Sequence, residues 1–234
     1  MRQIFLDTET TGLSPESGDR IVEIGCVEMI DRRLSGRSLH HYVNPERRNH
    51  DDALKVHGLD DEFLKNKPLF GAIADELLAF IDGAEVIIHN ASFDVGFLNE
   101  EMKRIGRAPI PSAVARVTCS LMLARDTYPG KSNSLDALCK RLEVNNSSRT
   151  LHGALLDAGL LAEVYIRMTR GQESLVIDGS DAGGPGHLVV PIDFSGFDLI
   201  VIEADEDEAA AHLHVIAEID KASSGRSLWA RFAA

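Results

Sequence analysis

Two carboxylates follow the first apolar run of the chain. The run Ile4–Leu6 predicts a buried strand, and Asp7 and Glu9 come at its end. Side chains two residues apart on a strand point the same way, so these two acids would lie side by side. Buried like charges repel each other and are costly to remove from water. The pair therefore predicts a bound cation, and the turn at 10–12 would bring backbone close to it.

Two further acids could complete the ligand set. Asp94 follows the apolar run 86–88, a second predicted buried strand, and begins a helical pattern. Strand ends that precede helices are common places for sites in α/β sheets, although an Asp there can also simply cap a helix. Asp157 lies early in a long helical pattern and borders its apolar stripe. A carboxylate facing a core needs a partner, which could be a metal ion or an arginine.

His152 is the candidate proton acceptor. It lies five residues before Asp157, and five residues on one helix turn through about 140°, so the two would not share a helical face. We therefore expect His152 in the loop or first turn before the helix, beside Gly153, where it could swing over the site. The alternative is a histidine at a helix start with no catalytic role.

Together these residues predict a site for phosphodiester hydrolysis. Oxygen-rich carboxylate sites select hard ions such as Mg²⁺ or Mn²⁺. Two such ions can activate an attacking water and stabilise the leaving oxygen, and a histidine that titrates near neutral pH suits a general base. The predicted metal ligands are Asp7, Glu9, Asp94 and Asp157, and the predicted base is His152.

The remaining pattern predicts the elements that would position these groups. Antiparallel strands come first and crossover units follow, which is typical of an α/β fold with a mixed sheet and helices on its faces. Strands are expected after the first at 21–30, 39–43 (with a hairpin at 32–36), 86–88 and 114–117. Helices are expected at 51–57, from 60, at 69–81, from 94 to 105, at 120–125, 135–142 and 152–170.

Composition predicts an ordinary globular protein. The 234 residues are 44% apolar and 26% charged, enough for one sizeable core and an appendage. No apolar run approaches the ~20 residues that cross a bilayer, and the start does not resemble a signal peptide, so we expect a cytoplasmic protein with no membrane contact. Three cysteines without paired spacing are expected to be reduced thiols.

The net charge of −13 is unevenly distributed. Residues 1–170 hold 21 basic and 25 acidic side chains, a net charge of −4, whereas residues 171–234 hold 3 and 12, a net charge of −9. With ions on its four candidate ligands, the first part would be near neutral. This argues against a protein that coats a duplex by counterion release. It suits one that grips a strand end through metal ions or is tethered to nucleic acid by a partner.

Composition also divides the chain. We expect one domain over 1–170, a flexible linker over 171–196 that is rich in Gly, Asp and Ser, and a small terminal segment over 197–234. That segment has a strand-like run at 198–202, a helix-like run at 203–220 and the only Trp, Trp229. Such an element could dock on another protein or pack back onto the main domain.

Three motifs resemble those of the DEDDh 3′→5′ exonucleases, which have a ribonuclease H-like fold. They are 7–12 (Asp-Thr-Glu-Thr-Thr-Gly), 89–94 (His-Asn-Ala-Ser-Phe-Asp) and 152–158 (His-Gly-Ala-Leu-Leu-Asp-Ala). Their order and spacing over 1–170 make the signal strong, although each motif alone would be weak. The resemblance implies the same ligands, the same base and two divalent ions.

The likeness narrows to the proofreading (epsilon) subunits of bacterial DNA polymerase III. Residues 56–59, 205–212 and 225–229 resemble that family's segments. The resemblance implies that 197–234 bind the polymerase catalytic subunit and that 172–177 (Gln172–Ile177) contact the sliding clamp, although this peptide lacks the terminal Phe of the stronger form. It also implies a single-stranded or frayed DNA 3′ end as substrate, because a mispaired terminus costs least to flip out. The residues expected to contact substrate are Asp7, Glu9, Thr10, Asp52, His57 and Asp157.

Two other functions stay open at this point. An RNA-trimming exoribonuclease of the same family would have the same residues in 1–170, and only the polymerase-like tail argues against it. A non-catalytic scaffold that kept the fold is the third alternative, which the intact carboxylates and His152 oppose.

Overall fold

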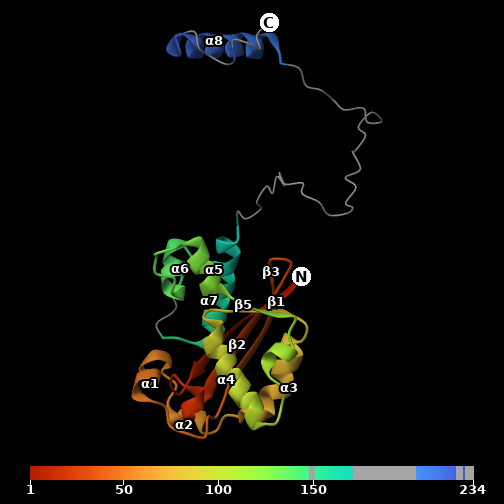
Figure 1. Cartoon of the computed structure of the whole chain (residues 1–234), viewed down its shortest axis with the longest axis vertical. Coiled ribbons are helices and arrows are strands. Elements are labelled where there is room, and N and C mark those ends of the chain that lie inside the picture. The colour runs from red at the N-terminus through yellow and green to blue at the C-terminus, as the bar shows by residue number, and fades with distance from the viewer. Residues whose placement is uncertain (148–150, 171–203, 225–228, 230–234) are drawn as a thin grey trace, which may run out of the picture. The chain divides into compact units, whose positions relative to one another are not determined.

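The fold is a mixed β-sheet between two layers of helices. The computed structural model describes residues 1–147, 151–170, 204–224 and 229. They fall into two units, one within Met1–Val176 and one within Ile177–Ala234, and each is described by itself. In the first unit the strand order is β3-β2-β1-β4-β5 (Figure 1). β1 pairs antiparallel with β2 and parallel with β4, so the predicted mixed sheet is confirmed.

The strands agree with the sequence pattern except at the edges of the sheet. They are β1 (Arg2–Thr10), β2 (Ile21–Ile30), β3 (Arg33–Tyr42), β4 (Glu85–Ile88) and β5 (Arg116–Cys119). The expected hairpin at 32–36 is wrong, because the turn consists of Asp31 and Arg32, both at positive φ, and β3 begins at once. The first half of β3 is polar and exposed, so no apolar alternation marks it. The strand expected at 114–117 lies two residues later, as β5.

The helices of the first unit begin and end close to the predicted residues. They are α1 (Asp51–His57), α2 (Asp61–Leu64), α3 (Phe70–Ile81), α4 (Ala91–Arg104), α5 (Ser120–Thr127), α6 (Leu135–Arg141) and α7 (Ala154–Met168). Two local signals explain the ends: Gly58 stops α1 at a φ of 72°, and Asp60 caps α2 by accepting a hydrogen bond from the Phe63 amide. α7 starts two residues after His152, which therefore lies in the preceding loop.

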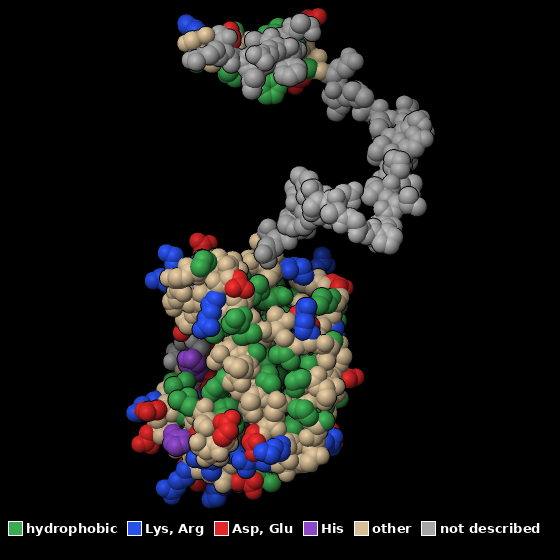
Figure 2. Space-filling view, in the orientation of Figure 1, with side chains coloured by type: hydrophobic (Ala, Val, Ile, Leu, Met, Phe, Trp, Pro, Cys, Tyr) green, Lys and Arg blue, Asp and Glu red, His purple; other side chains and the backbone are tan. Residues whose placement is uncertain are grey.

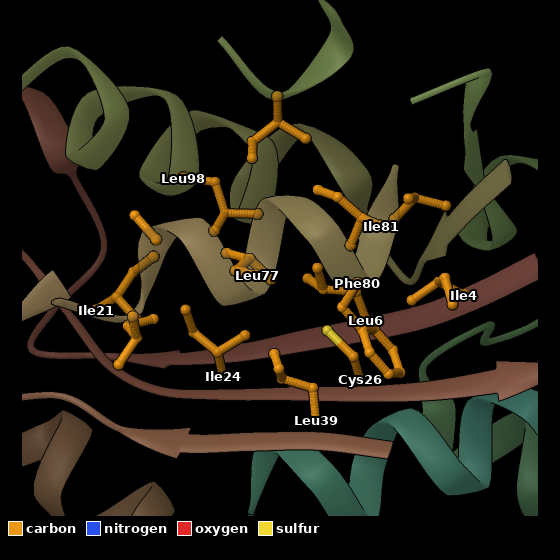
Figure 3. Packing of buried hydrophobic residues seen from close by; sticks show 14 of the residues in the cluster. Ile4, Leu6, Ile21, Ile24, Cys26, Leu39, Leu77, Phe80, Ile81 and Leu98 are labelled. Carbon is orange, nitrogen blue, oxygen red and sulfur yellow. The ribbon is translucent and has the colours of Figure 1, made fainter. Parts of the chain in front are cut away.

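Each face of the sheet has its own hydrophobic core. Ile4 and Leu6 of β1 pack with α3 and α4, and Figure 3 shows these side chains between the strands and the helices. Phe5 projects to the opposite face and packs with α5, α6 and α7. A strand buried on both faces is apolar at successive positions, which is why Ile4–Leu6 form a continuous run.

The surface of the first unit carries mixed charge. Figure 2 shows acidic and basic side chains interspersed over the visible face, as the small net charge of residues 1–170 implies. None of the three cysteines, all of them described, forms a disulfide. Among the described helices, none has the length and apolar character that a membrane crossing requires.

The second unit contains helix α8 (Glu206–Ala222). A reciprocal capping box between Asp205 and Glu208 begins it, which agrees with the helix expected at 203–220. The linker predicted at 171–196, the clamp peptide at 172–177 and the strand expected at 198–202 lie outside the described residues.

Candidate active site

Strand β1 distributes its polar side chains to two faces. Asp7 and Glu9 have the same parity as Phe5 and project to the α7 face, whereas Thr8 projects to the α4 face. Each set then meets an acid from the first turn of a helix: Asp157 on α7, and Asp94 on α4. The predicted side-by-side placement of Asp7 and Glu9 follows from this alternation.

Gly25 allows α7 to approach the sheet closely. It lies opposite Asp7 in the register of β1 and β2. A Cβ at this position would stand 2.2 Å from the Leu155 nitrogen and 2.3 Å from the Ala154 carbonyl carbon. Only a glycine fits this contact between β2 and the start of α7, which brings Asp157 to the end of β1.

Asp94 is held from the other side by Thr8. Its Oδ1 accepts hydrogen bonds from the Thr8 amide at 3.1 Å and the Thr8 hydroxyl at 2.7 Å. Burial raises the pKa of Asp94 to about 7, although the Thr8 donors oppose the shift. Without a cation, this carboxyl is therefore half-protonated near neutral pH.

His152 lies against Asp157 and is anchored through its backbone. Its Nδ1 is 3.4 Å from Asp157 Oδ2, and its amide donates to the Val56 carbonyl of α1 at 3.0 Å. The ring is about half exposed, whereas Asp157 is buried. Ligand atoms of Glu9, His152 and Asp157 all lie within 4.8 Å of one another.

All four predicted ligands and the predicted base line one cavity of about 290 Å³, which we call the catalytic cavity. Its lining residues are Asp7, Thr8, Glu9, His89, Phe93, Asp94, Ser134, Leu135, Asp136, His152 and Asp157. Five of them are acidic and none of these described residues is Lys or Arg. Clustered carboxylate oxygens without a protein cation fit one or more divalent ions.

A second hollow of about 550 Å³ adjoins the catalytic cavity and contains the remaining predicted substrate contacts. We call it the nucleoside hollow; its lining includes Thr10, Leu13, Asp52, Ala53, Val56 and His57. Burial lowers the pKa of His57, which is therefore neutral at pH 7. Its Nδ1 accepts from the Leu59 amide at 3.0 Å, so its Nε2 carries the proton and can donate. Asp52 is exposed and pairs with Lys55, so it reaches the hollow from its rim. The Thr10 hydroxyl donates to the Gly12 carbonyl at 2.6 Å and stiffens the turn beside the hollow.

Buried polar contacts hold that turn in place. Asp19 accepts hydrogen bonds from the Ser14 amide and the Thr11 hydroxyl and pairs with Arg47. Burial raises the pKa of Asp19, but these donors outweigh it, so the pKa stays below its usual range. Asp19 therefore remains charged and fixes the turn at physiological pH.

Several residues at the site were not assigned from the sequence, and three of them matter most for its geometry. Phe93 lines both the catalytic cavity and the nucleoside hollow, and its position in the second motif could have indicated this. Asp136, in the first turn of α6, had no signal beyond being an acid after a Ser cap. Gly25 stands within an otherwise apolar strand, a pattern typical of close backbone approach.

Comparisons with known proteins agree with this geometry. Residues 4–165 match the exonuclease family (RNase_T). A DNA polymerase III subunit epsilon of Pasteurella multocida (strain Pm70) is 48% identical over 97% of this chain and 93% of its own length. Exonuclease X, solved in complex with 5′ overhanging duplex DNA, superposes with a TM-score of 0.55 at 28% identity, over 71% of this chain and 90% of that one.

A more distant structure shows the same fold. The nuclease domain of 3′hExo, a DEDDh family member bound to rAMP, has a TM-score of 0.60 at 17% identity, over 71% of this chain and 90% of that domain. The likeness supports the ribonuclease H-like arrangement of sheet and helices. The chain belongs to the exonuclease family and, within it, to the epsilon subunits of DNA polymerase III, a group of proofreading 3′→5′ exonucleases.

Proposed function

We propose that this exonuclease hydrolyses the last phosphodiester bond of a DNA 3′ end with two Mg²⁺ or Mn²⁺ ions, as the editing subunit of a replicative polymerase. The observation that carries the proposal is that all four carboxylates and His152 line one cavity, beside a hollow large enough for a nucleoside. The ions would be held by Asp7, Glu9, Asp94 and Asp157.

The chain's own residues supply positioning and proton transfer. Bound divalent ions would acidify the attacking water and stabilise the leaving oxygen. With its Nδ1 toward Asp157, His152 would accept the water proton at Nε2, and Asp157 would stabilise the resulting imidazolium. Phe93 and Leu13 offer apolar surface to the terminal base, and His57 offers a polar group to its sugar.

The test is nuclease activity of Asp7→Ala and Asp157→Ala in the full chain. Each variant should lose activity on a single-stranded DNA 3′ end in Mg²⁺ or Mn²⁺ while keeping its circular dichroism spectrum. Asp126→Ala is the matched control, because Asp126 is exposed and lies outside the catalytic cavity. Wild-type rates in either ligand variant would overturn the proposed site.

The same assay separates DNA editing from RNA trimming. Matched DNA and RNA oligonucleotides, together with primers that end in a paired or a mispaired base, should show preference for DNA and for the mispaired end. A preference for RNA over DNA would favour the exoribonuclease instead. Activity on neither, with the metal bound, would favour the scaffold.

We also propose that residues 197–234 bind the polymerase catalytic subunit. Helix α8 supports this, because none of its residues is buried and Leu213, Val215 and Ile219 leave apolar surface exposed. Deletion of 171–234 should abolish copurification with that subunit and leave nuclease activity intact. Leu213→Glu should weaken copurification, and Glu218→Ala should not; equal binding by the deletion variant would exclude this role.

Two finer expectations remain proposals. Residues 172–177 would contact the sliding clamp weakly, so Gln172→Ala should reduce binding to immobilised clamp. The protein would act in the cytoplasm, where bacterial DNA is copied.

A further inference from the structure

A third hollow adjoins the catalytic cavity and is separate from the nucleoside hollow. The catalytic cavity shares Thr8, Glu9 and Phe93 with the nucleoside hollow, and shares His89 and Ser134 with this third hollow. The nucleoside hollow and the third hollow have no lining residue in common. The catalytic cavity with its carboxylates therefore adjoins two separate hollows, the nucleoside hollow and the third hollow.

The third hollow has the opposite charge to the catalytic cavity. Its volume is about 490 Å³, and we call it the cationic hollow; its lining residues are His89, Asn90, Leu121, Arg125, Lys131, Asn133 and Ser134. None of them is acidic. Among the described residues, neither Arg125 nor Lys131 takes part in an ion pair, whereas Arg20 and Arg47 of the same unit do.

His89 lies at the junction of the two spaces. Its Nδ1 is 2.9 Å from the Ser120 hydroxyl, and its Nε2 is buried without a hydrogen bond of ordinary geometry among the described residues. Burial lowers the pKa of His89, although a hydrogen bond to the Asn133 backbone opposes the shift, and the Arg125 charge lowers the pKa further. His89 therefore adds no positive charge to the hollow, and the charged groups that line it are Arg125 and Lys131.

We propose that the cationic hollow binds the phosphate next upstream of the scissile bond, with Arg125 and Lys131 as its charged contacts. The inference rests on the proposed function, because it takes the scissile phosphate to lie at the carboxylates. At the scissile phosphate, the terminal nucleotide of the DNA lies on one side and the rest of the DNA strand on the other. The more apolar nucleoside hollow suits the terminal base, and the cationic hollow suits the continuing backbone.

The test compares a dinucleotide with a trinucleotide. The dinucleotide thymidylyl-thymidine has only the scissile phosphate, whereas the trinucleotide has one phosphate upstream of it. In the full-length Arg125→Gln/Lys131→Gln variant, kcat/KM for the trinucleotide should fall by about 10-fold or more, as for a lost charged contact. The value for the dinucleotide should stay unchanged. On longer single strands the salt dependence should flatten, by about one unit of slope per lost phosphate contact.

Two controls make the result decisive. Lys140→Gln removes an exposed cation of α6 that lies outside the hollow, and it should act like the wild type on both substrates. A trinucleotide with a neutral methylphosphonate at the upstream linkage should be cleaved equally by wild type and double variant. An equal loss on dinucleotide and trinucleotide, or no loss on either, would overturn the subsite. Failure of the wild type to cleave the dinucleotide, the trinucleotides and the longer single strands alike would instead refute the proposed function.

Discussion

At the scale of single residues, the alternation of β1 explains how one strand positions candidate ligands on two faces of the sheet. Asp7 and Glu9 face α7, and Thr8 turns the other way to hold Asp94 by its amide and hydroxyl. The strand therefore sets the spacing of acids that come from two different helices. Rate measurements and metal titrations distinguish the expected role of His152 from that of Asp94.

His152 should act on the rate and not on ion binding. His152→Gln should lower kcat by about 10²–10⁴-fold, because the attacking water loses its proton acceptor. Since the ring also lies within 4.8 Å of Glu9 and Asp157 ligand atoms, Mn²⁺ titration of the same variant is needed. A comparable loss of Mn²⁺ affinity would make His152 a ligand instead of a base.

Asp94 should couple metal binding to pH. Its pKa of about 7 means that in the metal-free protein the carboxyl holds its proton below pH 7. A bound ion must displace that proton, so Mn²⁺ affinity should rise as pH approaches 7 and then level off. Calorimetry in buffers of different ionisation enthalpy measures the released proton. Asp94→Asn should abolish the release; affinity that is independent of pH below 7 would contradict this assignment.

At the scale of elements, the contact between β2 and α7 determines where Asp157 sits. Gly25→Ala would place a methyl group 2.2 Å from the Leu155 nitrogen, so α7 must move. We expect a loss of about 1–3 kcal/mol in the free energy of unfolding. A displacement of about 1 Å at a catalytic group can cost ~100-fold in rate, so kcat should fall at least that far.

The matched control lies on the same helix. A methyl group on Gly159 of α7 would meet nothing within 4 Å beyond the adjacent backbone of its own helix, so Gly159→Ala should keep full activity. It should raise the free energy of unfolding by about 0.5–1 kcal/mol through helix propensity. Full activity in Gly25→Ala would show that α7 can shift without disturbing the site.

Glu28 ties the antiparallel strands together at the far end of the sheet. Its buried carboxylate accepts from Arg2 Nε at 2.7 Å and from the Ser35 hydroxyl at 2.7 Å. The Arg2 hydrogen bond lowers the pKa of Glu28 below 4.5, although burial opposes it. Because the folded pKa is the lower one, this stability is present above pH 4.5 and is lost as pH falls through the folded value.

Glu28→Gln should therefore remove that pH dependence. The variant should unfold about 1–3 kcal/mol more easily at neutral pH, because Arg2 loses its charged partner. The difference from wild type should shrink in acid, as urea titrations at several pH values would show. A constant difference across that range would mean that the contact is not electrostatic.

At the scale of the whole molecule, the sequence predicted the features that are determined by short stretches of the chain. The mixed sheet, the glycine stop of α1 and the loop position of His152 follow from alternation, caps and helical phase. The polar first half of β3 was not predicted, because an exposed edge strand has no alternation of apolar residues. Gly25 and Phe93 were not predicted as site residues, because each acts through contacts between elements that are distant in the sequence.

Helix α1 contacts both the nucleoside hollow and the loop that carries His152. Its Val56 and His57 line the nucleoside hollow, and the Val56 carbonyl holds the amide of His152. Occupancy of the hollow would steady α1 and, through that one hydrogen bond, the loop that carries the base. Filling of the nucleoside hollow and placement of His152 would thus depend on one and the same helix.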